Sequence, residues 1–126
     1  MNRDTRAVVE DHWKAANSRD WEAFSALLHP TLRYDVPQTR ETIESGAGYL
    51  EMFRTWPGQW TARVTLLVCE DRKAVCIIDF VVGEETTAGI SVFEVDGGLI
   101  ERVTDYWPAP YEPPERLTPH MKRRPA

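Results

Sequence analysis

Residues 89–107, GISVFEVDGGLIERVTDYW, carry the pattern that decides the fold. Residues 89–95 and 99–107 are rich in β-branched and aromatic residues, which is typical of β-strands. Asp96-Gly97-Gly98 lies between the two runs and is a strong signal for a tight hairpin turn. The stretch therefore predicts a pair of antiparallel strands.

A second hairpin is predicted upstream, from residues 63–69 and 74–82 with a polar turn at residues 70–73. The run 75–82, VCIIDFVV, is apolar on both faces except for Asp79. A strand of this kind has to be covered on both sides, and the helices of one chain can cover only one. We therefore expect a homodimer that forms through the sheet.

The N-terminal part of the chain predicts helices. Residues 4–29 have apolar residues at helical spacing, with a break before Asp20, which caps a second, shorter helix ended by Pro30. Residues 41–55 return to helical spacing after a short alternating strand at residues 32–36. Three helices followed by a mostly antiparallel sheet indicate an α+β fold. Helices on one face of a strongly curved sheet would leave a cone-shaped pocket for a small molecule.

The composition is that of a globular protein, with 42% hydrophobic and 28% charged residues in a chain of 126. This length predicts a single domain, which we assign to residues 1–107. Residues 108–126 hold six of the nine prolines and are expected to form an extended tail.

The charge balance and the cysteines indicate which partners and which cellular compartment to expect. A net charge of −5 argues against nucleic-acid and anionic-membrane partners, because both need a basic surface. Neither a bilayer-spanning apolar stretch nor a signal peptide is predicted. Cys69 and Cys76 flank the first hairpin turn as diagonal neighbours, at a separation that is long for a disulfide. We expect two reduced thiols and a cytoplasmic protein.

Two aspartates are the candidate catalytic residues. Asp105 lies on the strand face that also carries Val103 and Trp107, and Asp79 shares a face with Ile77. Two carboxylates in one apolar cavity would split into a protonated acid and an ionised base. The alternative for Asp105 is an exposed strand-end position or a hydrogen bond to the backbone. The alternative for Asp79 is a partner such as Arg102 or His12.

The candidate substrate-binding residues come from several segments. His12 lies on the apolar stripe of the first helix, Tyr34 lies on the apolar face of the short strand, and Phe53, Trp56 and Trp60 cluster after the third helix. Val103 and Trp107 complete the set beside Asp105. Ordinary core packing is the alternative for each of them.

Cofactor signatures are missing from the sequence. His12 has no second histidine or carboxylate at metal-ligand spacing beside it, and the chain has no glycine-rich phosphate loop. The sequence therefore predicts neither a metal nor an organic cofactor.

The chain resembles SnoaL-like proteins of the nuclear-transport-factor-2-like superfamily from about residue 5 to residue 108. The resemblance rests on the order of elements and on residues 12–21 (HWKAANSRDW), 34–37 (YDVP), 96–100 (DGGLI) and 104–107 (TDYW). It implies a fold rather than one activity, because the superfamily includes isomerases, cyclases, dehydratases, epoxide hydrolases and proteins that only bind ligands.

The resemblance to individual enzymes of the superfamily is partial. The carboxylates of ketosteroid isomerase would fall on Val36 and near Ile90, so steroid isomerisation is not expected. The arginine and asparagine that hold water in limonene epoxide hydrolase would fall on Ile77 and Val36. Its general acid or base would fall on Asp105, and an acid/base aspartate in the late sheet is also what the SnoaL-like cyclases imply.

These observations favour a protein that holds a small, largely apolar organic molecule. The expected chemistry is proton transfer with Asp105 as the general acid or base and Asp79 assisting, as in an isomerase, cyclase, lyase or hydrolase. The alternative is a non-catalytic ligand-binding or assembly domain of the same fold.

Overall fold

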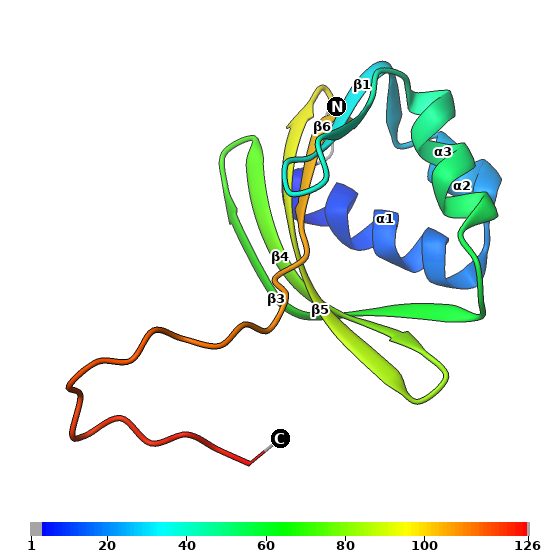
Figure 1. Ribbon diagram of the computed structural model, residues 1–126. Helices are drawn as coiled ribbons and strands as arrows, with labels where there is room; N and C mark the ends of the chain where they lie inside the picture. The colour runs from blue at the N-terminus through cyan, green and yellow to red at the C-terminus, as the bar shows by residue number, and fades with distance from the viewer. Residues whose placement is uncertain (1–3, 126) are drawn as a thin grey trace.

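Three helices pack on one side of a six-stranded sheet in the computed structural model, which describes residues 4–125 (Figure 1). This arrangement confirms the predicted α+β fold. The helices are α1 (Thr5–Ser18), α2 (Trp21–Ser25) and α3 (Gly46–Thr55). The strands are β1 (Leu28–Val36), β2 (Glu41–Ile43), β3 (Trp60–Glu70), β4 (Lys73–Val82), β5 (Glu85–Asp96) and β6 (Leu99–Tyr106).

Side-chain caps fix where each helix begins. Asp4 accepts a hydrogen bond from the Ala7 N–H at 2.7 Å, and Asp20 accepts from the Ala23 N–H at 3.1 Å. Ser45 caps α3, so the third helix begins five residues later than predicted, and residues 41–43 form β2 instead. Within residues 4–125, no helix is both long and apolar enough to cross a bilayer.

The strands follow the order β2-β1-β6-β5-β4-β3, and every neighbouring pair is antiparallel except β1 and β6. Both predicted hairpins are present, as β3–β4 and β5–β6. β1 begins at Leu28, four residues earlier than predicted, because Leu28 pairs with Ile100 of β6. The register of this pairing then shifts between Leu28 and Arg33. Pro30 lies in this irregular segment, where the sheet needs no hydrogen bond from its backbone nitrogen. It does not end α2, which stops at Ser25.

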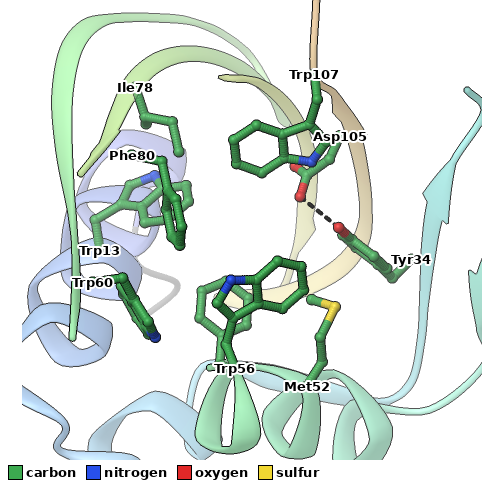
Figure 2. A pocket seen from close by; sticks show the side chains of 10 residues that line it. Trp13, Tyr34, Met52, Trp56, Trp60, Ile78, Phe80, Asp105 and Trp107 are labelled. Carbon is green, nitrogen blue, oxygen red and sulfur yellow. Dashed lines mark hydrogen bonds between the residues drawn. The ribbon is translucent and has the colours of Figure 1, made fainter. Parts of the chain in front are cut away.

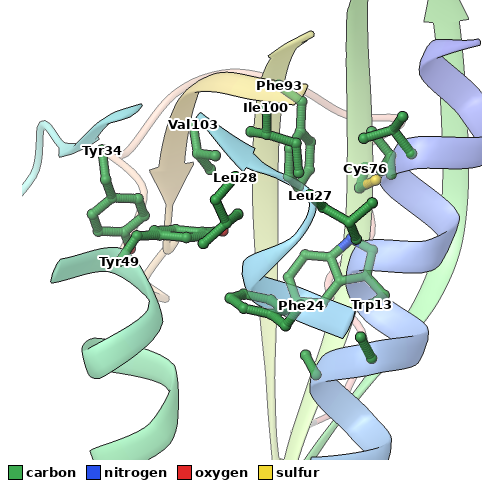
Figure 3. Close-up of a cluster of buried hydrophobic side chains, with 14 of the residues drawn as sticks. Trp13, Phe24, Leu27, Leu28, Tyr34, Tyr49, Cys76, Phe93, Ile100 and Val103 are labelled. Atoms are coloured by element: carbon green, nitrogen blue, oxygen red, sulfur yellow. The ribbon is translucent and has the colours of Figure 1, made fainter. Parts of the chain in front are cut away.

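The core lies between the helices and the sheet (Figure 3). Its largest fully buried apolar side chains include Phe24, Leu32, Tyr49, Phe93 and Ile100. They come from α2, β1, α3, β5 and β6, so nearly every element contributes to one cluster. This packing holds the central strands against the helices and leaves the ends of the strands free to form a site.

The opposite face of the sheet has no helix over it. Cys76 and Ile78 of β4 are buried toward the helices, so Val75 and Ile77 point away from them. Val75 is 38% exposed, and its neighbour across the ladder, Val68, is 54% exposed. Leu66, opposite Ile77, continues this apolar surface. We call these four residues the outer patch.

The C-terminal tail leaves the body after Trp107 and runs in an extended conformation (orange to red in Figure 1). Tyr111 and Leu117 are among its exposed apolar residues. A bidentate ion pair joins Arg123 to Glu112 with N–O distances of 2.6 and 2.8 Å, so the tail turns back on itself. The described tail residues therefore interact mainly with one another.

We propose that a second copy of the chain covers the outer patch. Val75→Lys should convert the dimer to a monomer of 14.5 kDa, because a buried ammonium without a partner opposes association. Light scattering at micromolar concentration measures this directly. Ser25→Lys, on the exposed side of α2, is the matched control and should leave the dimer intact. A monomeric wild-type protein would contradict the proposal.

Candidate functional site

A small pocket opens between α3 and the sheet, and aromatic side chains form most of its walls (Figure 2). It encloses about 40 Å³, which is room for a few water molecules. Its walls come from α1, β1, α3, β3, β4, β6 and the residues just after α3 and β6. The lining residues are Trp13, Tyr34, Met52, Phe53, Trp56, Trp60, Ile78, Phe80, Asp105 and Trp107.

Asp105 is the only carboxylate among these lining residues, and two hydroxyl groups hold it in place. The Tyr34 hydroxyl donates to its Oδ2 at 2.6 Å, and the Ser91 hydroxyl donates to its Oδ1 at 2.6 Å. All three side chains are buried. Distances this short are typical of hydrogen bonds to an ionised acceptor. The carboxylate is therefore fixed in orientation before any ligand arrives.

The surroundings of Asp105 make its charged form less favourable than it is in water. Burial raises the pKa of the Asp105 carboxyl above its usual 3.8, and the hydrogen bonds from Ser91 and Tyr34 oppose this only in part. The pKa of Tyr34 is raised far above its usual value, first by burial and then by the negative charge of Asp105. Tyr34 therefore remains a hydrogen-bond donor at neutral pH, while Asp105 is placed to exchange a proton.

A larger groove lies outside the pocket and has a volume of about 690 Å³. The two spaces share five lining residues, which form a neck between them: Tyr34, Met52, Trp56, Phe80 and Trp107. A volume of this order accommodates a drug-sized organic molecule, whereas the inner pocket does not. A ligand body would therefore lie in the groove, with only a small group reaching through the neck to Asp105.

Trp107 is held in the neck by a dedicated set of contacts. The Gln38 side-chain amide accepts a hydrogen bond from the backbone N–H of Trp107 and donates one to the backbone carbonyl oxygen of Trp107 at 2.9 Å. A neighbouring strand would make the same pair of bonds. The indole lies over Gly89, where a Cβ would come within 2.8 Å of Trp107 Cζ3. Gly89 thus leaves the space that this ring fills, and the two residues together set the width of the neck.

Trp60 forms the opposite wall and is packed on both faces. Phe80 stacks on it with ring centroids 5.6 Å apart. The Arg19 guanidinium lies 3.8 Å from the Trp60 ring centroid and donates to the Trp60 carbonyl oxygen at 2.6 Å. These contacts fix the wall, because the Trp60 indole ring cannot rotate between them.

The structure brings six of the nine predicted site residues together around the inner pocket. They are Tyr34, Phe53, Trp56, Trp60, Asp105 and Trp107. The other three, Asp79, His12 and Val103, lie elsewhere.

The expectation that Asp79 faces the same cavity as Asp105 is wrong. Ile78 and Phe80 line the pocket, so Asp79 between them points to the other face of β4. There its carboxylate pairs with Arg63, directly opposite on β3, at 2.7 Å. Asp79 is therefore in a structural ion pair, and the site has one carboxylate rather than two.

His12 and Val103 belong to the core and not to the pocket lining. Both side chains are fully buried. Burial lowers the pKa of His12 to about 3, so the imidazole is neutral, and its Nε2 lies 2.8 Å from the Tyr49 hydroxyl. In residues 4–125, no group of three histidine, cysteine or acidic side chains is placed to hold a metal ion.

The sequence interpretation missed four residues that line the pocket, Trp13, Met52, Ile78 and Phe80. It also missed three residues that position the site: Ser91, Gln38 and Gly89. Ser91 shares the buried face of β5 with Phe93 and Val95, and a lone hydroxyl among apolar side chains is a signal that could have found it. Gln38 and Gly89 gave no such signal, because their role depends on contacts with Trp107, which is far from both in sequence.

Comparisons with known proteins agree with this architecture. A family model described as "SnoaL-like domain" matches residues 9–103. A crystal structure from Kribbella flavida, described as a "putative ketosteroid isomerase", is 38% identical with a TM-score of 0.92 and covers 99% of this chain and 93% of that one. No curated protein matches this chain.

More distant structures share the fold alone. An LEH-like epoxide hydrolase from M. tuberculosis is 19% identical with a TM-score of 0.69 and covers 81% of this chain and 80% of that one. A "putative polyketide cyclase" from Sinorhizobium meliloti is 14% identical with a TM-score of 0.70, covering 79% and 93% respectively.

Asp105→Asn should stabilise the protein at neutral pH. Since the carboxyl pKa is higher in the folded state, the contribution of Asp105 to stability is fully present below pH 3.8 and is lost as pH rises through the folded-state pKa. Each pKa unit of that difference corresponds to about 1.4 kcal/mol. Urea unfolding from about pH 4 to about pH 8 should show the advantage of the variant growing with pH. Asp79→Asn, on the outer face, is the control and should show no such gain.

Gly89→Ala should displace Trp107 from the neck. The added methyl would overlap the indole, at a cost of about 1–3 kcal/mol in the free energy of unfolding. Near-ultraviolet circular dichroism should report the altered tryptophan environment, and urea unfolding the cost. The cost should largely disappear when Gly89→Ala is combined with Trp107→Ala; an undiminished cost would mean that Trp107 is not what Gly89 accommodates.

Proposed function

Because the chain belongs to the SnoaL-like family and has the nuclear-transport-factor-2-like fold, we propose that it is a small-molecule enzyme that transfers a proton through Asp105. The observation that carries the proposal is a single buried carboxylate, oriented by two hydroxyl groups, at the end of an aromatic pocket. The substrate is a small, largely apolar organic molecule whose body lies in the outer groove.

The geometry suggests how the proton would move. An ionised Asp105 would act as the general base toward a C–H or O–H group that reaches through the neck. Once Asp105 holds the proton, it no longer needs both hydroxyl donors, and Tyr34 on the neck is free to donate to an oxygen of the substrate. Returning the proton to a different atom would complete an isomerisation, a cyclisation or an elimination.

One carboxylate rather than two narrows the chemistry. With Asp79 paired to Arg63 on the outer face, Asp105 is the one carboxylate among the residues that line the inner pocket. Isomerase, cyclase or lyase chemistry needs a single residue that takes a proton and returns it. Hydrolysis needs in addition a group that holds water, and the polar groups of the pocket lining are Asp105, the Tyr34 hydroxyl and the indole N–H groups of its tryptophans.

A non-catalytic binding domain is the second candidate, and the small volume and apolar walls of the inner pocket favour it. In that case Asp105 would serve as a hydrogen-bonding anchor for the ligand. The two candidates share the pocket, the apolar ligand and the proposed dimer, and they differ only in whether the ligand leaves chemically changed.

We also place the protein in the cytoplasm. Cys69 and Cys76 are both free thiols, which suits a reducing compartment. Burial raises the pKa of the Cys76 thiol to about 11, so this cysteine is an inert core residue rather than a nucleophile.

Deuterium exchange tests the proposed activity without knowledge of the natural substrate. Small enolisable ketones and related apolar carbonyl compounds are incubated with the protein in heavy water, and mass spectrometry measures deuterium uptake. Asp105→Asn should lower the exchange rate by about 10²- to 10⁴-fold, the range expected for general acid–base catalysis. Asp79→Asn should leave the rate unchanged. Tight binding without exchange across the panel would favour the binding domain.

A further inference from the structure

The charged groups that line the site are all of one sign. The inner pocket contains Asp105, and the outer groove contains Glu41 and Glu85. Among residues 4–125, no lysine or arginine lines either space. A carboxylate or phosphate on the ligand would have no cation to pair with and would face these acids, so an anionic ligand is excluded on electrostatic grounds.

The walls of the inner pocket suit a positive charge. The rings of Trp56, Phe80 and Trp107 lie around the same space as Asp105 (Figure 2), and Phe53 also lines the pocket. The face of an aromatic ring attracts a cation, and a cage of such rings is a common way to bind an organic ammonium group. With Asp105 as counter-ion at the closed end, the pocket combines both elements of an ammonium site.

Arg19 is a cation that contacts one of these walls, and it does not line the pocket. Its guanidinium lies against Trp60 and donates to the carbonyl oxygens of Ala16 and Trp60, outside the pocket lining. Since Phe80 covers the other face of Trp60, this indole has no free face for a ligand. The rings that remain for a cation are those of Phe53, Trp56, Phe80 and Trp107.

The volumes of the two spaces fit a ligand with a small cationic head and a larger apolar body. The inner pocket, at about 40 Å³, can take a head group the size of a few water molecules. The groove, at about 690 Å³, can take an apolar body, with Glu41 and Glu85 near it. A compact cationic head on a flat apolar body matches both spaces.

Resting on the function proposed above, we propose that the substrate is an apolar organic cation, with a protonated amine in the inner pocket and the apolar body in the outer groove. The ammonium group stabilises the ionised form of Asp105 and so keeps this residue a base. The substrate class is thereby narrowed from any small apolar molecule to an apolar amine.

Three naphthalene compounds of nearly equal shape test this inference: 2-naphthylmethylammonium, 2-naphthylmethanol and 2-naphthoate. Isothermal titration calorimetry at neutral pH measures the affinity of each. The ammonium compound should bind at least about tenfold more tightly than the alcohol, and the carboxylate should not bind measurably. Equal or tighter binding of the alcohol overturns the inference but leaves the proposed function standing. Failure of all three to bind overturns both.

Two variants locate the effect in the pocket. Asp105→Asn should lower the affinity for the ammonium compound at least about tenfold and leave that for the alcohol nearly unchanged, while Asp79→Asn should change neither. Trp56→Leu, at a residue that is 45% exposed and tolerant of change, should reduce the ratio of the two affinities by removing one ring. A ratio unaffected by both Asp105→Asn and Trp56→Leu would contradict the assignment of the cation to this pocket.

Discussion

A one-residue register shift between β5 and β6 is the constraint on which the site depends. Val95 pairs with Ile100, but Glu94 pairs with Arg102, so Glu101 is skipped in the ladder. Side chains alternate between faces along a strand, and one extra residue reverses which of them point inward. Ile100 and Asp105 therefore both face the helices, although strict alternation would place them on opposite faces. Without the shift, Asp105 would lie opposite Ile90 and Ser91 opposite Thr104.

Burial of Asp105 is tolerated because its partners arrive from two other strands. Ser91 lies directly opposite on β5, and Tyr34 reaches across from β1. A buried carboxyl group without hydrogen-bond donors would be strongly destabilising, whereas two hydroxyl donors offset much of that cost and fix its orientation. What remains is a raised pKa, which is the physical basis for acid–base chemistry at this position.

The aromatic residues of the pocket differ in how they are held. Trp60 is packed between Arg19 and Phe80 and is part of the rigid wall. Trp107 begins the segment that leads into the tail and is held mainly by Gln38 and the space above Gly89. The neck thus has one fixed side and one side whose position depends on a few contacts.

The sequence by itself determined the two hairpins, the three helices and the α+β fold, because each depends on local periodicity and turn chemistry. It also determined which residues of β4 share a face, but not which face the helices would cover. Asp79 lies on a strand that is apolar on both sides, so either face was compatible with the pattern. Only the packing of the helices against Ile78 and the ion pair with Arg63 decided that Asp79 points outward. Likewise, the hydrogen bonds to Asp105 and the contacts of Trp107 with Gln38 and Gly89 join residues that are far apart in sequence. Such contacts exist only once the sheet register is fixed.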